Sequence, residues 1–151
     1  MNEQELQKIA TETVDEFIKT LGIEGKAEIS LSDEAVTVVF TTEDTGVIIG
    51  YHGEVLEALQ LLLSIAITKK AGKFIRVSVD AGEYKKNRIT WLEQLATQTK
   101  EKALEQQREI ELSNLKSWER RVIHLFLQED KEVVCESFGE GKDRILVVQP
   151  R

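Results

Sequence analysis

The first apolar residues of the chain recur at the spacing of one helix face. They are Leu6, Ile9, Ala10, Val14, Phe17, Ile18 and Leu21. Asn2 and Glu5 supply the two residue types of a capping-box variant, and Gly22 supplies a stop signal. The pattern predicts an amphipathic helix of about five turns that begins after Asn2 and ends before Gly22.

Three later segments have the composition of strands. Residues 26–31 alternate apolar with polar side chains, which is typical of a strand with one solvated face. Residues 35–41 are more continuously apolar and predict a more central strand, with residues 32–34 as the turn between the two. Residues 74–80 predict a third strand with its apolar side chains on one face.

Two glycines three residues apart, Gly50 and Gly53, follow one apolar run and open another. Without a Cβ atom, a glycine adopts backbone angles that other residues avoid and lets the backbone approach a ligand. The second run predicts a helix from residue 53 to about residue 70, apolar on most sides and therefore largely buried, and Gly72 ends it. At a helix N-terminus, such a turn directs amide donors outward, where they can bind phosphate.

The second half of the chain begins with a long helix pattern. Residues 84–108 contain no Pro or Gly and carry an apolar stripe, so we expect one helix that connects two units. Residues 110–112 predict a short strand, and Ser117 is placed to N-cap a helix over residues 118–128. Two further strands close the chain. They cover residues 132–137 and 144–149 and are joined by residues 138–143.

Arg120 and His124 are four residues apart and therefore lie on one face of the predicted helix. A guanidinium can bind a phosphate through two donors or stack on a base, and an imidazole can donate to phosphate or stack. The alternative is a structural role, in which the pair holds the C-terminal hairpin.

The composition is that of a soluble globular protein, with 41% hydrophobic and 31% charged residues among 151. No apolar run is long enough to cross a bilayer, so we expect no membrane insertion. The N-terminus lacks the basic and apolar regions of a signal peptide, and the single Cys135 excludes an internal disulfide. These features indicate a cytoplasmic location.

The formal net charge of −7 disfavours nucleic-acid binding at first sight, since affinity for phosphate is largely electrostatic. The charge is uneven, however. Residues 1–82 hold seven Lys or Arg against fourteen Asp or Glu, residues 83–108 hold six against four, and residues 109–151 hold seven against nine. Basic residues also gather in clusters, which are either phosphate contacts or solvated faces. These are Lys69, Lys70, Lys73 and Arg76, then Lys85, Lys86 and Arg88, then Arg120 and Arg121.

Catalytic chemistry has little support. His52 and His124 lie in separate parts of the chain without metal-ligand spacing, and no Ser or Cys is placed with a His and a third group. No Walker-type glycine loop is present. We therefore expect a protein that is not an enzyme and needs no metal or cofactor. Trp91 and Trp118 are expected in a core or interface, and Cys135 in a packed strand.

The residues at the glycine turn match a known pattern. They are Ile49, Gly50, Tyr51, His52 and Gly53, followed by Val55, Leu56 and Leu59. The pattern resembles the KH domain, whose GXXG loop clamps the backbone of single-stranded nucleic acid. The order helix, strand, strand, glycine turn, helix, strand is that of a type II KH domain, with the short helix before the turn reduced to residues 43–45. This resemblance implies that residues 50–53 hold the sugar-phosphate backbone, with Ile48 and Ile49 in the wall for bases.

Tyr51 and His52 form the variable pair of the turn, where KH domains usually have a strongly basic residue. Tyr51 is suited to base stacking or to packing on a partner protein. His52 is either a contact to phosphate or base, or an exposed turn residue.

A second match lies in the second half of the chain. It comprises Glu119, Arg120, Arg121, Val122, Ile123 and His124, and then residues 137–144. It closely resembles the R-three-H domain, named for an Arg separated from a His by three residues and associated with single-stranded nucleic acid. The resemblance implies nucleic-acid contacts at Arg120, Arg121 and His124, with Arg144 joining them from the hairpin. The proline that is common before this helix is absent from residues 114–118.

The order of the two matches resembles the bacterial Jag family of RNA-binding proteins. We expect an α+β fold with a type II KH-like domain over residues 1–82, a connecting helix over residues 83–108 and a small α/β R-three-H domain over residues 109–151. Many members carry a further N-terminal Jag domain, which this chain is expected to lack.

The resemblance implies a function as well as a fold. We expect binding of single-stranded RNA, or of single-stranded DNA, by a post-transcriptional regulator or RNA chaperone linked to the cell envelope, cell shape and division, or sporulation. A homodimer, or pairing with a small protein made of a KH domain alone, is also expected. The alternative is a protein–protein scaffold or dimerisation module with vestigial RNA binding. The acidic total favours this alternative, and the Arg120 and His124 pair disfavours it.

Overall fold

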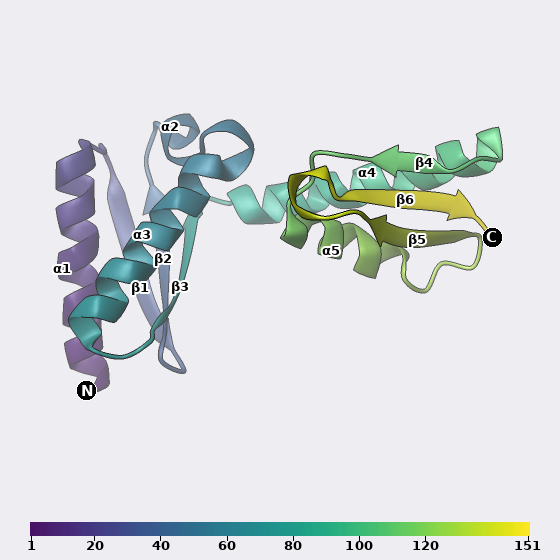
Figure 1. Ribbon diagram of the computed structural model, residues 1–151. Helices are drawn as coiled ribbons and strands as arrows, with labels where there is room; N and C mark the ends of the chain where they lie inside the picture. Colours follow the sequence, from purple (N-terminus) through teal and green to yellow (C-terminus); the bar gives the residue numbers. More distant parts are fainter. The chain divides into compact units, whose positions relative to one another are not determined.

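The computed structural model describes all 151 residues and divides into two compact units, residues 1–85 and residues 86–151 (Figure 1). Each unit has its own three-stranded sheet and its own hydrophobic core. The predicted α+β class is confirmed, with a helix–strand–strand–helix–strand order around the glycine turn in the first unit.

The first unit opens with α1 (Glu3–Leu21), which has the predicted capping box. Asn2 Oδ1 accepts the backbone N–H of Glu5 at 2.8 Å, and Glu5 Oε2 accepts the backbone N–H of Asn2 at 3.0 Å. Gly22 ends the helix in the left-handed conformation. The apolar stripe of α1 faces the core, as its spacing predicts.

The sheet of the first unit contains β1 (Lys26–Ser32), β2 (Ala35–Thr41) and β3 (Arg76–Ala81), with β2 in the centre as predicted. β1 is antiparallel to β2, and β3 is parallel to it because a helical crossover joins them. The register places the apolar residues of all three strands on one face, which α1 and α3 (Glu54–Ala71) cover (Figure 1).

The short helix before the glycine turn differs from the prediction. We expected it to be reduced to residues 43–45, whereas α2 covers Thr45–Ile49. Its apolar residues were too few for periodicity to distinguish a helical turn from extended backbone. Burial decides the conformation, because Ile48 is 2% exposed and Ile49 packs against the same core.

The prediction that α3 is largely buried is wrong for one of its faces. The side chains that face the core are Leu56, Leu59, Leu63 and Ile67. A second row at the same helical spacing is exposed, and we call it the α3 stripe. It consists of Ala58, Leu61, Leu62 and Ile65. A helix that is apolar on several sides does not reveal from sequence which side the sheet covers.

The second unit contains most of α4 (Tyr84–Gln106), β4 (Ile110–Leu112), α5 (Ser117–Leu127), β5 (Val133–Phe138) and β6 (Ile145–Pro150). Its sheet has the order β4-β6-β5 and is antiparallel throughout. The core forms where apolar residues of α4 and α5 meet those of the three strands.

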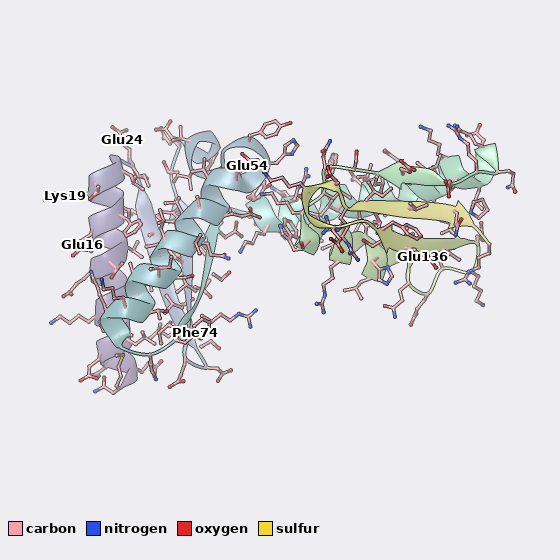
Figure 2. All side chains as sticks on the ribbon, viewed as in Figure 1. Glu16, Lys19, Glu24, Glu54, Phe74 and Glu136 are labelled. Atoms are coloured by element: carbon pink, nitrogen blue, oxygen red, sulfur yellow. The ribbon has the colours of Figure 1, made fainter.

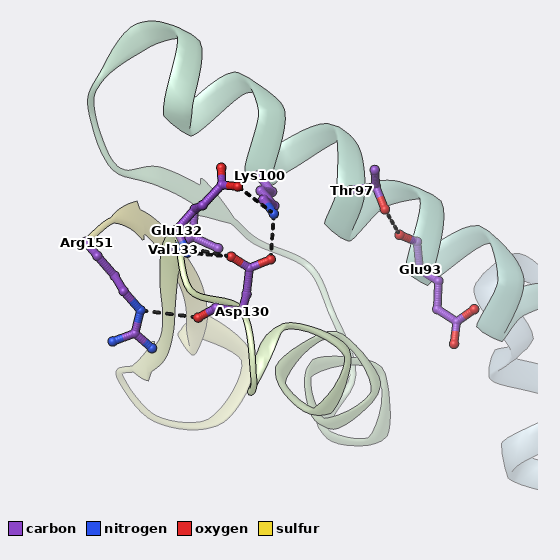
Figure 3. Close-up of polar contacts among 7 residues, drawn as sticks. All are labelled: Glu93, Thr97, Lys100, Asp130, Glu132, Val133 and Arg151. Atoms are coloured by element: carbon purple, nitrogen blue, oxygen red, sulfur yellow. Dashed lines mark hydrogen bonds and ion pairs between the residues drawn. The ribbon is translucent and has the colours of Figure 1, made fainter.

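A network of hydrogen bonds and ion pairs connects the loop after α5 to α4 (Figure 3). Lys100 Nζ lies 2.6 Å from Asp130 Oδ2 and 3.9 Å from Glu132 Oε1. Asp130 Oδ1 accepts the backbone N–H groups of Glu132 and Val133 at 2.8 and 3.2 Å, and Arg151 Nε donates to the carbonyl oxygen of Asp130 at 3.2 Å. The hydrogen bond from Lys100 lowers the pKa of Asp130 below its usual value.

None of the helices combines the length and the apolar composition that a membrane crossing requires.

Candidate nucleic-acid interface

Both glycines of the turn are required by its shape. Gly50 has φ 69° and ψ −168°, and a Cβ atom there would lie 2.3 Å from Val55 Cγ2. Gly53 has φ 77°, and its Cβ would lie 2.9 Å from the hydroxyl oxygen of Tyr84. The chain therefore passes through a tight turn, η1 (Tyr51–Gly53), that leads directly into α3.

The variable pair of the turn presents two aromatic rings to solvent. Tyr51 is 75% exposed and His52 is also exposed. Their ring centroids are 4.0 Å apart at an interplanar angle of 82°, an edge-to-face contact. Exposed aromatic rings of this kind are typical stacking platforms for unpaired bases.

The surroundings of the turn do not favour phosphate binding by the helix N-terminus alone. The first turn of α3 carries Glu54 and Glu57, which have the same charge sign as a phosphate. Ile48, expected in a wall for bases, is 2% exposed and packs in the core, and its place in the site stays a prediction. Ile49 is half-buried and packs partly on the same core.

One basic residue of the first unit was not among the predicted site residues. Lys85, on the first turn of α4, has its Nζ atom 3.2 Å from Ser78 Oγ and 3.5 Å from Gln60 Oε1. The preceding residue, Tyr84, packs against Gly53. The basic cluster at residues 85–88 was visible in the sequence, but the contacts of Lys85 with Ser78 and Gln60 follow only from the tertiary structure.

In the second unit, two hydrogen bonds to residues at the start of α5 hold the guanidinium of Arg120 in position. Its Nη1 atom donates to the carbonyl oxygen of Leu115 at 2.6 Å, and its Nη2 atom donates to Ser117 Oγ at 3.2 Å. Arg120 is half-buried, whereas His124, one helical turn further on, is exposed. The side chain of Arg120 is therefore bonded to the start of its own helix and not to the C-terminal hairpin.

Ser117 is the first residue of α5 and not its N-cap, which is Lys116. The prediction of a serine cap is therefore wrong. The carboxylate of Glu119 takes that role, because its Oε2 atom accepts the backbone N–H of Lys116 at 3.0 Å. The Ser117 hydroxyl is consequently available to accept from Arg120.

The remaining two arginines of the predicted site, Arg121 and Arg144, differ in their exposure and in their hydrogen bonds. Arg121 is exposed on α5. Arg144 donates from Nε to Ser137 Oγ at 2.8 Å and from Nη1 to the carbonyl oxygen of Gly139 at 3.0 Å, so it closes its own hairpin. No hydrogen bond or ion pair joins Arg144 to Arg120 or His124, and its place in the site stays a prediction.

A buried ion pair joins α4 to α5. Arg88 Nε lies 2.7 Å from Glu119 Oε1, and the Glu119 side chain is 1% exposed. Arg88 also lies over the ring of Trp91 at 4.3 Å, and Trp91, expected in a core or interface, is 46% exposed. Trp118 does pack against the core. The burial of Glu119 could have been predicted from the sequence, since Glu119 stands four residues before the buried Ile123 and thus on the apolar face of α5.

The described residues include no group of three or more His, Cys, Asp or Glu side chains placed to hold a metal ion. Burial raises the pKa of the Cys135 thiol to about 11, which disfavours the reactive thiolate. Cys135 is packed in β5, as the sequence predicts.

Residues 3–80 match the family described as "KhpA/KhpB, KH domain", and residues 90–150 match the R-three-H domain. The chain belongs to the KhpB/Jag family. The predicted order, a KH domain followed by an R-three-H domain, is confirmed. This membership places the chain in a family of RNA-binding proteins rather than enzymes.

Three relatives carry the name "RNA-binding protein KhpB". The protein of Clostridium symbiosum is 32% identical over 128 residues, which cover 85% of this chain and 58% of the relative. The Bacillus subtilis protein is 31% identical over 138 residues, which cover 87% of this chain and 66% of the relative. The Streptococcus pneumoniae protein is 27% identical over 148 residues, which cover 95% of this chain and 45% of the relative. The chain thus spans only part of the length of these relatives.

Proposed function

We propose that this protein binds single-stranded RNA, with one binding surface on each unit. It would act as a post-transcriptional regulator or RNA chaperone linked to the cell envelope, division or sporulation. The observation that carries the proposal is the arrangement on α5, where Arg120 is held in place and His124 stands exposed one turn away. The KhpB name of the relatives supports RNA over single-stranded DNA.

On the second unit, Arg120 uses two of its five N–H donors to fix its position. The remaining donors, with exposed Arg121 and His124, form a compact set of phosphate and base donors. On the first unit, Tyr51 and His52 offer stacking surfaces beside the glycine turn. Two weak sites on one chain increase the overall affinity through the effective concentration of the second contact.

The test uses a fluorescent single-stranded RNA pool of random sequence, bound across a salt series. Two double variants remove exposed side chains without touching the internal contacts of Arg120: Tyr51→Ala with His52→Ala, and Arg121→Ala with His124→Ala. Lys131→Ala, an exposed basic residue outside both sites, is the control.

We expect steep salt dependence for the wild type and at least about tenfold weaker binding by the second double variant, because charged contacts to phosphate dominate affinity. Loss of stacking should weaken the first variant by about 1–3 kcal/mol per base. Equal binding by wild type and both double variants would remove these residues from the site. Absence of binding by the wild type would reject the function.

A second function is supported by the α3 stripe. We propose that the first unit also pairs through this stripe, either with a second copy or with a small protein made of a KH domain alone. Leu61, Leu62 and Ile65 are 62%, 51% and 57% exposed, and an apolar row of this kind marks an interaction surface. Phe74, at the turn after α3 (Figure 2), is 83% exposed.

Light scattering of the pure protein tests the pairing with a second copy. A dimer mass that falls to the monomer mass in Leu62→Glu with Ile65→Glu, with RNA affinity retained, would support the scaffold function. A monomeric wild type would leave only pairing with a different KH protein.

A further inference from the structure

Lys85 directly follows Tyr84, the residue that packs on the glycine turn, although both are far from the turn in sequence. Its neighbour Tyr84 packs so closely on Gly53 that an added Cβ atom would lie 2.9 Å from the tyrosine hydroxyl oxygen. The hydrogen bonds of the Lys85 ammonium reach back to β3 at Ser78 Oγ, 3.2 Å away, and to α3 at Gln60 Oε1, 3.5 Å away. Its position is therefore set by three elements of the first unit.

These contacts lie at an open edge of the sheet. β3 is an outer strand, because the strand order is β1-β2-β3. The backbone N–H of Val79, on this edge strand, donates to Gln60 Oε1 at 3.0 Å. Gln60 thus holds both the strand edge and Lys85, and the ammonium sits at a defined point of the β3 edge.

The charge of Lys85 is not paired within the protein. Its two partners are the neutral oxygens of a serine and a glutamine. Other lysines of the same unit form ion pairs, such as Lys70 with Glu16 at 2.9 Å and Lys73 with Glu34 at 2.6 Å.

Asp80, five residues before Lys85, accepts backbone N–H groups of Ala81 and Lys85 at 2.8 and 3.4 Å. Neither Asp80 nor Glu83, two residues before Lys85, forms an ion pair with the Lys85 ammonium. Lys85 is half-buried. Neutral partners offset only part of the free energy that it costs to remove a charged ammonium from water. The ammonium also has a third N–H donor, which can bind an anion.

We propose that Lys85 binds a phosphate of the single-stranded RNA that passes the glycine turn. It would supply the positive charge that Tyr51 and His52, in the variable pair, do not carry. This inference rests on the proposed RNA binding and assigns to it a residue outside the turn itself. Ser78 and Gln60 act as positioning residues, since they hold the ammonium and do not themselves contact the phosphate.

The experiment measures binding of the same fluorescent RNA pool across a salt series by the full chain. Lys85→Gln removes the charge and keeps a polar side chain. Lys19→Gln makes the same charge change on α1, which packs against β1 at the other edge of the sheet (Figures 1 and 2), and serves as the matched control. Lys85→Arg restores a cation at the site.

We expect about fivefold or greater loss of affinity in Lys85→Gln and a salt slope that is lower by about 0.7, the contribution of one phosphate contact on a single strand. Lys19→Gln should bind like the wild type, and Lys85→Arg should recover most of the affinity. Circular dichroism checks that each variant is folded.

Gln60→Glu provides a test that keeps Lys85 in place. The new carboxylate would stand within ion-pair distance of the Lys85 ammonium and neutralise it, so the same loss of affinity and slope is expected. If the wild type binds and both Lys85→Gln and Gln60→Glu bind equally well, the inference is overturned and the proposed function stands. If the wild type does not bind RNA, both are rejected.

Discussion

At Gly50 the backbone angles, φ 69° and ψ −168°, lie in a region that is nearly closed to residues with a Cβ atom. A methyl group there would also collide with Val55 Cγ2 at 2.3 Å. We predict that Gly50→Ala lowers the free energy of unfolding by about 2 kcal/mol or more. Urea unfolding followed by far-UV circular dichroism measures the change.

Gly46→Ala is the matched control, because Gly46 lies in α2 with no atom within 4 Å of an added Cβ. It should be neutral or slightly stabilising. An equally small effect at Gly50 would contradict the steric argument. The expected loss at Gly50 also means that substitution of the turn glycines tests folding together with RNA binding, whereas Tyr51→Ala with His52→Ala tests binding alone.

The sequence predicted those structural features of the candidate site that depend on local pattern. The glycine spacing indicated the turn, and the spacing of Arg120 and His124 indicated a shared helix face. It did not predict the place of Lys85, because the contacts with Ser78 and Gln60 join residues 7 and 25 positions away. It did not predict the burial of Ile48 either, because a short apolar run does not show which of its members are buried.

Among the elements, α4 and α5 are held together by a charge pair inside an apolar interface. Arg88 and Glu119 are 13% and 1% exposed in their side chains. Removing one partner leaves the other charge buried and unpaired, so we predict that Glu119→Ala lowers the free energy of unfolding by about 3–5 kcal/mol. Urea unfolding followed by tryptophan fluorescence measures it. Arg121→Ala, on the exposed side of the same helix, should change stability by less than about 0.5 kcal/mol.

The loop after α5 should make stability depend on pH. The pKa of Asp130 is lowered from 3.8, chiefly by the hydrogen bond from Lys100. A carboxyl whose pKa is lower in the folded state stabilises the protein above its unfolded pKa, and this contribution is lost as the pH falls through the folded value. We predict that Asp130→Asn is less stable than the wild type at neutral pH and that the difference shrinks below pH 3.8.

Urea unfolding at neutral pH and in acid measures how much of the stability difference between Asp130→Asn and the wild type comes from the charge of Asp130. Glu129→Gln changes an exposed carboxylate next to Asp130 and should show little difference at either pH. A difference between Asp130→Asn and the wild type that persists unchanged in acid would show that the charge of Asp130 is not the cause.

Elements with strong periodicity or clear caps were predicted closely. α1 has its capping box at Asn2 and its stop at Gly22. The errors fall where tertiary contacts decide. α2 forms because Ile48 enters the core, one face of α3 is left uncovered, and Glu119 caps α5 from a buried position where Ser117 was expected to do so. None of these contacts is encoded in local spacing.

On the scale of the whole molecule, the acidic net charge belongs to one unit. Residues 1–85 hold 8 Lys or Arg and 15 Asp or Glu, whereas residues 86–151 hold 12 of each. The total of −7 therefore describes the first unit and does not oppose RNA binding by the second. In the first unit, a single unpaired cation such as Lys85 has a correspondingly larger influence on where a phosphate can approach.

The two hydrophobic cores share no residue, which predicts that the units unfold independently. Both tryptophans, Trp91 and Trp118, lie in the second unit, so their fluorescence reports that unit alone, whereas far-UV circular dichroism reports both.

Leu63 is fully buried in the first core, and Leu63→Ala should lower the stability of that unit by about 2–5 kcal/mol. We expect an earlier transition by circular dichroism and an unchanged midpoint by fluorescence. Ile123→Ala, in the second core, should shift the fluorescence midpoint instead. A fluorescence midpoint that moves with Leu63→Ala would mean that α4, which begins in one unit and continues through the other, transmits unfolding between them.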